Sequence, residues 1–240
     1  SVRDKVLYVL LFFAAVTIVG SKALGWISIG QDIKIIKDIT LAATSVFGAL
    51  IAIFVGASLI YKEIDKRTLY TILARPMDRW EFIIGKYLGL MALLAVVVGV
   101  MTGVSVGYIL LMGGPIDAVY LLAALLIYFK LMVVTALALL TSSLSSPILG
   151  AIIVFCFYVF GHATGVFKDL PPQFKDTVAE KVLHFVYYVV PNLGNFDIRA
   201  EAANSVAVNP AYIAYVIVYG LGYSAILLLL ATIAFERKDI

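Results

Sequence analysis

Most of the residues that could do chemistry lie in one polar stretch, residues 61–86, between two long apolar runs. This stretch holds the densest group of charges in the chain and contains both signs, so it is suited to contacts with a charged partner in water. Catalysis would need a nucleophile, an acid and a base held together, and no such set can be placed among the apolar runs. The sequence therefore indicates binding in this stretch, and the chain is not expected to be an enzyme.

Within that stretch, residues 64–74 have the spacing of a short amphipathic helix. Leu69, Ile72 and Leu73 would share its apolar face, and charged residues gather at its start. Pro76 should end this helix, because proline lacks the amide hydrogen and clashes with the preceding turn. A short helix held between two apolar runs could transmit force. The same charges could instead only anchor the loop on one side of a membrane.

The start of the next apolar run carries a second set of polar residues. Asp78 can cap a helix there, with Glu81 completing a capping box, so the helix should begin near Arg79. Gly85 and Lys86 do not form a phosphate-binding loop, because the G-x-x-x-x-G-K-[ST] pattern is absent from the sequence. If ATP drives this protein, a partner must therefore bind it.

One charge lies near the middle of an apolar run. Lys130 falls near the middle of residues 118–140, where a charge is costly and a functional role is the default expectation. No Asp or Glu falls inside any of the apolar runs, so no ionic partner is evident. Lys130 could line a water-filled pathway and meet an anionic group of a substrate. It could instead lose its proton, snorkel or bond to a backbone carbonyl.

Metal and nucleic-acid sites have little support in the sequence. His162 and His184 are isolated from each other and from other soft ligands, so no metal site is expected. The basic residues of 61–86 are too sparse for nucleic acid, and the phosphate headgroups of a membrane account for them more simply.

The composition sets the elements that must hold these residues. Of the 240 residues, 63% are hydrophobic and 14% charged, and the mean hydropathy is +1.05. Soluble domains carry about a quarter charged residues. Apolar stretches of about 20 residues cross a bilayer as helices, because lipid offers the backbone no other hydrogen-bond partner. The sequence thus predicts an all-α polytopic membrane protein, with residues 1–240 as one transmembrane domain. The predicted spans are residues 5–26, 39–61, 82–112, 118–140, 147–166 and 211–235.

The charges predict the orientation of these spans. Placing both termini in the cytoplasm puts most lysines and arginines in short inner segments, and residues 61–86 contribute the most to this bias. The outer side then carries one long segment, residues 167–210, and a stretch of that length in a compact domain is usually functional or partly structured.

Within the outer segment, residues 177–190 have the pattern of an amphipathic helix too short to span a membrane. Such a helix should lie at the interface or dip part-way in. A helix of this kind would suit a lid over a pathway, and an ordinary surface helix is the alternative. The candidate residues of an outer gate are Phe185, Tyr187, Tyr188, Pro191 and Asn192.

Residues 63–86 resemble the signature of ABC-2 type ABC transporter permeases. That pattern is an acidic residue, then Arg/Gly-Thr-Leu, a proline with arginine three residues on, and a closing Gly-Lys. The chain matches it at Glu63, Arg67, Thr68, Leu69, Pro76, Arg79, Gly85 and Lys86. The layout of six spans with a long outer segment before the last is similar too. Residues 191–197, PNLGNFD, also resemble an element of the copper-enzyme-maturation branch of these permeases.

The resemblance implies the permease subunit of an ATP-driven exporter. In such permeases the loop between the second and third spans carries a coupling helix that docks on a separate cytoplasmic ATPase. Two permeases work with two ATPases, and ATP and Mg²⁺ would bind to the ATPase rather than to this chain. Outer re-entrant gate helices are implied within residues 167–197. The residues implied for the coupling helix are Glu63, Asp65, Lys66, Arg67, Thr68, Leu69, Ile72, Leu73 and Arg75. Many relatives begin with an interfacial helix, and here only residues 1–4 precede the first predicted span.

Two other functions stay open at this point. The chain could be a mechanotransmission module that uses ATPase motion to drive a periplasmic partner through residues 167–210 without moving solute. A secondary carrier is less favoured, because the spans lack the carboxylates that relay protons or sodium. The expected partners are ABC ATPase subunits, a second permease copy in a homodimer and membrane lipid, with a periplasmic protein in the mechanotransmission case. The expected location is a bacterial or archaeal inner membrane.

Overall fold

The structure is a computed structural model that describes residues 32–61, 79–168 and 190–236. Every regular element within those ranges is helical. The five long helices are α2 (Asp32–Leu59), α5 (Arg79–Leu111), α6 (Ala118–Leu144), α7 (Pro147–Lys168) and α10 (Pro210–Glu236). Two short elements, the 3₁₀ helix η2 (Leu193–Phe196) and the helix α9 (Arg199–Asn204), lie between α7 and α10 in the sequence.

Five of the six predicted spans are helices at the predicted places. By length and composition, α2, α5, α6 and α10 are each able to cross a membrane, and the apolar part of α7, Pro147–Ala163, is shorter. The all-helical, multi-pass prediction is confirmed, and the number of six spans stays a prediction. The predicted first span, the predicted coupling helix and residues 177–189 of the predicted outer helix lie outside the described residues.

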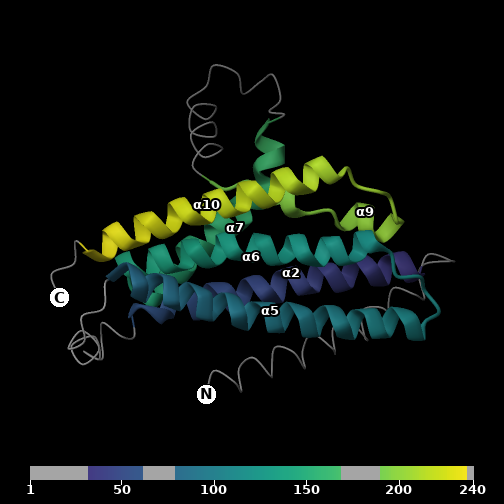
Figure 1. The fold of residues 1–240 in the computed structure, drawn as a ribbon, viewed down its shortest axis with the longest axis horizontal. Coiled ribbons are helices and arrows are strands. Elements are labelled where there is room, and N and C mark those ends of the chain that lie inside the picture. Colours follow the sequence, from purple (N-terminus) through teal and green to yellow (C-terminus); the bar gives the residue numbers. More distant parts are fainter. Residues whose placement is uncertain (1–31, 62–78, 169–189, 237–240) are drawn as a thin grey trace.

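The long helices lie side by side, and successive helices run in opposite directions (Figure 1). The helix α6 is central and packs against α2, α5, α7 and α10. We call the end of the bundle that contains the starts of α2, α6 and α10 the outer end, and the opposite end the inner end, after the predicted topology. The polar stretch 62–78 therefore joins α2 to α5 at the inner end.

Small residues allow α2 and α6 to approach closely. A Cβ atom built at Gly48 would lie 2.6 Å from the side chain of Leu131, and one at Gly56 would lie 2.7 Å from Cβ of Ala138. Close backbone approach of this kind supplies the van der Waals contact that holds helices together in lipid. In contrast, a Cβ built at Gly103 of α5 has no described atom within 4 Å apart from the neighbouring backbone of its own helix.

The helix α2 begins at Asp32, well before the predicted start at residue 39. An ion pair explains the difference, because Nζ of the buried Lys37 lies 2.7 Å from Oδ2 of Asp117, at the start of α6. The Ser205 hydroxyl donates to the same oxygen. The hydrogen bond from Lys37 holds the pKa of Asp117 below its usual range. Prediction from hydropathy stops at charged residues, whereas the paired charge lets the helix continue.

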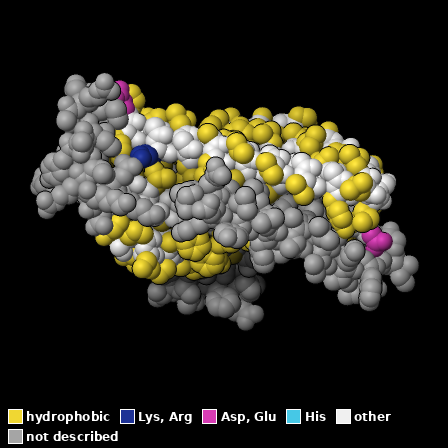
Figure 2. All heavy atoms as spheres, turned by 90° about the horizontal axis from the view of Figure 1, so that it is seen from below, with side chains coloured by type: hydrophobic (Ala, Val, Ile, Leu, Met, Phe, Trp, Pro, Cys, Tyr) yellow, Lys and Arg dark blue, Asp and Glu magenta, His cyan; other side chains and the backbone are white. Residues whose placement is uncertain are grey.

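The surface of the bundle suits lipid. Figure 2 shows hydrophobic side chains along the middle of the visible face, with charged side chains of the described residues only near its two ends. Phe54, Leu111, Ile148 and Val218, from four different helices, are each more than half exposed. Contiguous apolar surface of this extent is rare on soluble monomers and is expected where a helix bundle contacts hydrocarbon.

Candidate functional sites

At the inner end, hydrogen bonds fasten α2 to α6 next to the polar stretch 62–78. The backbone N–H groups of Ile60 and Tyr61, just past the end of α2, donate to Oγ of Ser142 at 3.1 and 3.3 Å. Ser142 lies in the last turn of α6 and is fully buried. The side chains of Phe82 and Phe235 stack nearby at 5.8 Å between ring centroids, which ties α5 to α10. We call the contact of Ser142 with the two amides the inner tie.

All of the residues predicted for ATPase docking, 63–75, lie outside the described residues, and so do Pro76 and Asp78 of the predicted third-span entry. The third-span entry is described from Arg79, the predicted start, which is the first residue of α5. Glu81 lies in the first turn of α5, where a negative charge is favoured. Nζ of Lys86 lies 5.3 Å from the centre of the Phe82 ring. Apart from the neighbouring backbone of α5, no atom of the described residues lies within 4 Å of a Cβ built at Gly85.

In the interior, a group of polar side chains surrounds Lys130. Its Nζ donates to Oγ of Ser45 in α2 at 2.5 Å and lies 3.3 Å from Nε2 of His162 in α7. The hydroxyl of Tyr158, also in α7, lies 3.3 Å from Oγ of Ser45. The Lys130 side chain is 1% exposed. We call these four residues the Lys130 cluster, and it joins α2, α6 and α7.

The hydrogen bonds of His162 fix its tautomer. Nδ1 lies 2.8 Å from the carbonyl oxygen of Tyr158, and because a carbonyl can only accept, Nδ1 carries the hydrogen. Nε2 then has a free lone pair and accepts from the ammonium of Lys130, which has no lone pair of its own. Both hydrogen-bond acceptors that the described residues offer to Lys130 are therefore neutral groups.

Among the described residues, an opposite charge that acts on Lys130 comes from Asp197 in the outer segment. Asp197 accepts from Nε and Nη2 of Arg199 at 2.7 Å each, in a two-pronged ion pair. Both charges act on Lys130 through space, with opposite signs. Burial raises the pKa of Asp197, but the hydrogen bonds and charge of Arg199, helped by Lys130, outweigh burial and lower it. The same pair raises the pKa of Arg199.

Residues 190–199, here called the seated segment, pack tightly onto the bundle. Pro191 is buried, and its carbonyl oxygen would lie 2.7 Å from a Cβ built at Gly161 of α7. The backbone N–H of Asn192 donates to the hydroxyl of Tyr219 of α10 at 2.9 Å. Figure 1 shows this part of the chain running between α7 and α9 along α6 and α10. Two of the predicted gate residues, Pro191 and Asn192, thus lie in a packed segment.

A comparison with protein families gives one match, which covers residues 21–240 and is described as ABC-2 family transporter protein. The chain belongs to the ABC-2 transporter family. No curated protein matches the chain. This ABC-2 protein is thus a multi-pass membrane protein and the permease subunit of an ABC transporter, and the family implies association with a cytoplasmic ABC ATPase. The match does not confirm the resemblance to the copper-enzyme-maturation branch, which stays a prediction.

The structure of this ABC-2 permease brings together residues that the sequence did not connect. Ser142 was not predicted as a functional residue, although the serine-rich run 141–146 was visible in the sequence. Asp197 was not linked to Lys130, because it lies outside every span and reaches the cluster only when the outer segment folds back. The charges at 197 and 199, directly after the PNLGNF run, were the available signal. Phe185, Tyr187 and Tyr188 lie outside the described residues.

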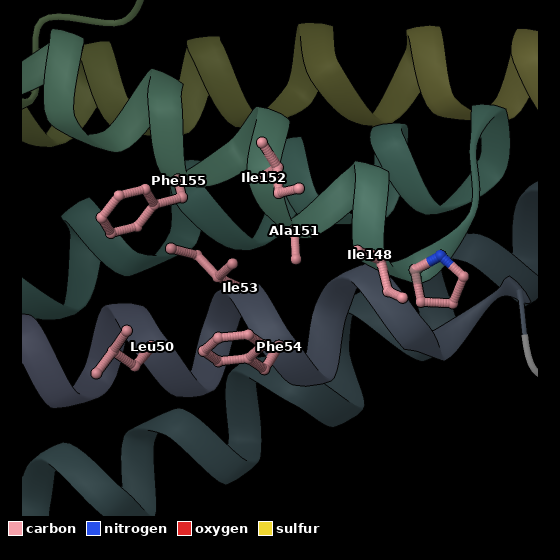
Figure 3. A pocket seen from close by; sticks show the side chains of 8 residues that line it. Leu50, Ile53, Phe54, Ile148, Ala151, Ile152 and Phe155 are labelled. Carbon is pink, nitrogen blue, oxygen red and sulfur yellow. The ribbon is translucent and has the colours of Figure 1, made fainter.

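An apolar groove runs between α2 and α7 on the surface of the ABC-2 permease (Figure 3). Its volume is ≈ 470 Å³. The lining residues are Leu50, Ile53, Phe54, Pro147, Ile148, Ala151, Ile152 and Phe155. A lining with almost no polar surface can be covered only by lipid chains or by the apolar face of another membrane helix. Among the described residues, no group of three or more His, Cys, Asp or Glu side chains could hold a metal ion.

Proposed function

We propose that the chain is the membrane permease of an ATP-driven exporter that works as a homodimer with two cytoplasmic ABC ATPases. ATP and Mg²⁺ bind to the ATPase subunits, and this chain supplies the docking element, residues 63–75, and the path. The family match supports the permease role. The resemblance in the sequence of residues 63–86 supports docking at this loop. Both termini lie in the cytoplasm of a bacterial or archaeal cell, and residues 167–210 lie outside.

The inner tie is the observation that carries this proposal. Residues 62–78 connect α2 to α5, so a push on them would tilt those two helices. The two hydrogen bonds to Ser142 extend that movement to α6, the central helix. Buried hydrogen bonds between neutral groups are costly to break, because each N–H left without an acceptor loses about 1–3 kcal/mol. The docking loop is therefore mechanically joined to the helix that carries Lys130.

The Lys130 cluster supports a path through this part of the bundle. Lys130 contacts α2 and α7 through Ser45 and His162, so a tilt of α2 against α6 changes its surroundings directly. A lipidic or amphipathic substrate suits a bundle whose surface is apolar and whose interior holds few charges. We assign to Lys130 the role of meeting the anionic part of such a substrate when the path opens.

A second function is favoured by the packing of the seated segment. Gly161 in α7 and Tyr219 in α10 hold it directly against the bundle, so helix movement would also move the outer segment. A permease that drives an outer protein through residues 167–210, and moves no solute, would use the same contacts. The two functions differ in whether a periplasmic protein stays bound to the chain.

Purification of the chain from native membranes under mild detergent, followed by mass spectrometry and an ATPase assay, tests the proposal. An ABC ATPase should copurify, and Arg67→Glu should remove it, because the substitution reverses a charge in the docking element. Lys181→Glu makes the same reversal in the outer segment and should leave the ATPase bound.

Copurification that survives Arg67→Glu would reject residues 63–75 as the docking element. Loss of the ATPase in Lys181→Glu alone would place the ATPase on the other side of the membrane and would reject the topology. A periplasmic protein in the same preparation, released by Lys181→Glu, would favour the mechanotransmission function over export.

A further inference from the structure

Two lysines in the bundle are buried to the same extent but differ in their partners. Lys37 and Lys130 are each 1% exposed. Nζ of Lys37 lies 2.7 Å from a carboxylate oxygen of Asp117 at the outer end. Among the described residues, no carboxylate lies within 4.0 Å of Nζ of Lys130. The two side chains therefore meet the cost of burial in different ways.

The compensation of Lys130 is incomplete. An ammonium has three N–H donors, and the described residues provide two acceptors, Oγ of Ser45 and Nε2 of His162, both neutral. The carboxylate of Asp197 acts from a distance, and it already accepts two hydrogen bonds from Arg199. Taking a charge out of water is costly unless a close, well-bonded partner offsets the loss of hydration. This burial cost is present in the packed form and would fall wherever water reached the ammonium.

The seated segment packs at the level of Lys130. Phe196 is fully buried, and its ring would lie 3.0 Å from a Cβ built at Gly220 of α10. The carbonyl oxygen of Phe129, the residue before Lys130, lies 3.8 Å from the same point. The segment therefore lies on the part of α6 that carries the lysine, and its removal would open the interior beside Lys130 to water from the outer side.

Building on the proposed function, we propose a second role for Lys130, in which its buried charge destabilises the packing of the seated segment and so favours release of that segment toward the outer side. With the segment packed on the bundle, the described residues give the ammonium neither a third hydrogen-bond acceptor nor a counter-ion in contact. When the segment lifts, water hydrates the ammonium, so the charge favours the lifted form over the packed one. Small movements transmitted through α6 are then enough to unseat residues 190–199. Lys37 has no such effect on the packing of the seated segment, because the carboxylate of Asp117 contacts and neutralises its ammonium.

A single-cysteine reporter in the full chain measures the lifting. Cys156→Ser removes the only cysteine, and Leu193→Cys places a thiol in the seated segment, where the native side chain is 1% exposed. The rate of reaction with a membrane-impermeant maleimide is measured in right-side-out membrane vesicles, with and without ATP enclosed in the vesicle lumen, which is the cytoplasmic side. Lys130→Met should slow the reaction about tenfold or more, because an apolar side chain of similar length removes the buried charge. The control Lys37→Met should leave the rate unchanged.

An equal or faster reaction in Lys130→Met, repeated with Lys130→Leu, would overturn the proposal and show that the charge holds the segment down. A thiol that never reacts in the chain that keeps Lys130 would overturn it too, because the segment would not lift. The comparison of variants without ATP does not depend on an ATPase partner, so its result stands apart from the test of the exporter itself.

Discussion

The inner tie and the Lys130 cluster both join α2 to α6, but they do so with different chemistry. In the inner tie, Oγ of Ser142 accepts from two backbone N–H groups, and every partner is neutral. In the Lys130 cluster, a full charge on α6 meets a hydroxyl of α2 and an imidazole of α7. The tie and the cluster are both buried and lie on the same pair of helices, so the difference lies in charge.

Because of that difference, the inner tie is suited to transmit helix movement, and the Lys130 cluster is suited to respond to it. A matched neutral contact gains little from water and keeps its geometry while helices tilt. An incompletely compensated charge gains from any water that reaches it. A movement that begins at the inner end would therefore pass through the inner tie to α6. Its effect would appear at Lys130, where the buried charge favours the form with the seated segment lifted. The predictions that follow break one region while leaving the other in place.

The largest effect is expected from filling the space under the seated segment. In Gly161→Val, the added atoms would clash with the Pro191 carbonyl oxygen. The seated segment should therefore no longer pack against α7, while the inner tie stays intact. Overpacking of this kind costs about 3 kcal/mol. Thermal unfolding in detergent should show the loss, and the thiol at position 193 should react faster. Gly103→Val is the matched control, since no described side chain lies within 4 Å of a Cβ at that position. Equal losses in the two variants would contradict the packing described.

A smaller effect is expected from breaking the inner tie. Ser142→Ala leaves the N–H groups of Ile60 and Tyr61 without their acceptor and should destabilise the protein by about 2 kcal/mol. Ser143→Ala is the control, because the Ser143 hydroxyl only donates to the Leu140 carbonyl within its own helix. The two variants are compared by thermal unfolding. A loss in Ser143→Ala as large as in Ser142→Ala would mean that the tie contributes nothing specific.

The smallest effect is expected from breaking the ion pair between Asp197 and Arg199 in the seated segment. The pKa of Asp197 is lowered in the folded protein, so the pair contributes stability above the usual carboxyl pKa and loses it as the pH falls through the lowered value. Arg199 is about a third exposed, so the contribution should be at most about 1 kcal/mol. Asp197→Asn should flatten the acid side of a melting-temperature profile, and Arg199→Gln should do the same. A profile unchanged by both substitutions would show that the pair is not a source of stability.

The sequence predicted most of the fold because the fold depends on long apolar runs. The predicted spans 82–112, 118–140, 147–166 and 211–235 agree with helices whose bounds differ by a few residues. The start of α2 was wrong because Lys37 and Asp117, which lie far apart in the sequence, neutralise each other in space. A pattern based on hydropathy along the chain contains no information on such a pair.

The candidate site was less predictable for the same reason. The burial cost at Lys130 could be predicted from its place in an apolar run. That no carboxylate of the described residues contacts Lys130 agrees with the sequence. The contacts with Ser45 and His162 depend on the rotation of α2 and α7 about their axes, which weakly amphipathic helices do not specify. The role of Asp197 depends on how the outer segment folds back, and no local pattern describes that.

The most direct test of this account is the ATP dependence of thiol reaction at position 193 in the complex with its ATPase, compared between Ser142→Ala and Ser143→Ala. The account predicts that ATP accelerates the reaction in the parent reporter and in Ser143→Ala. In Ser142→Ala the acceleration should be lost while the ATPase still binds and hydrolyses ATP. Acceleration that persists in Ser142→Ala would show that movement reaches the seated segment by another route, and it would contradict the inner tie as the joint between docking and release.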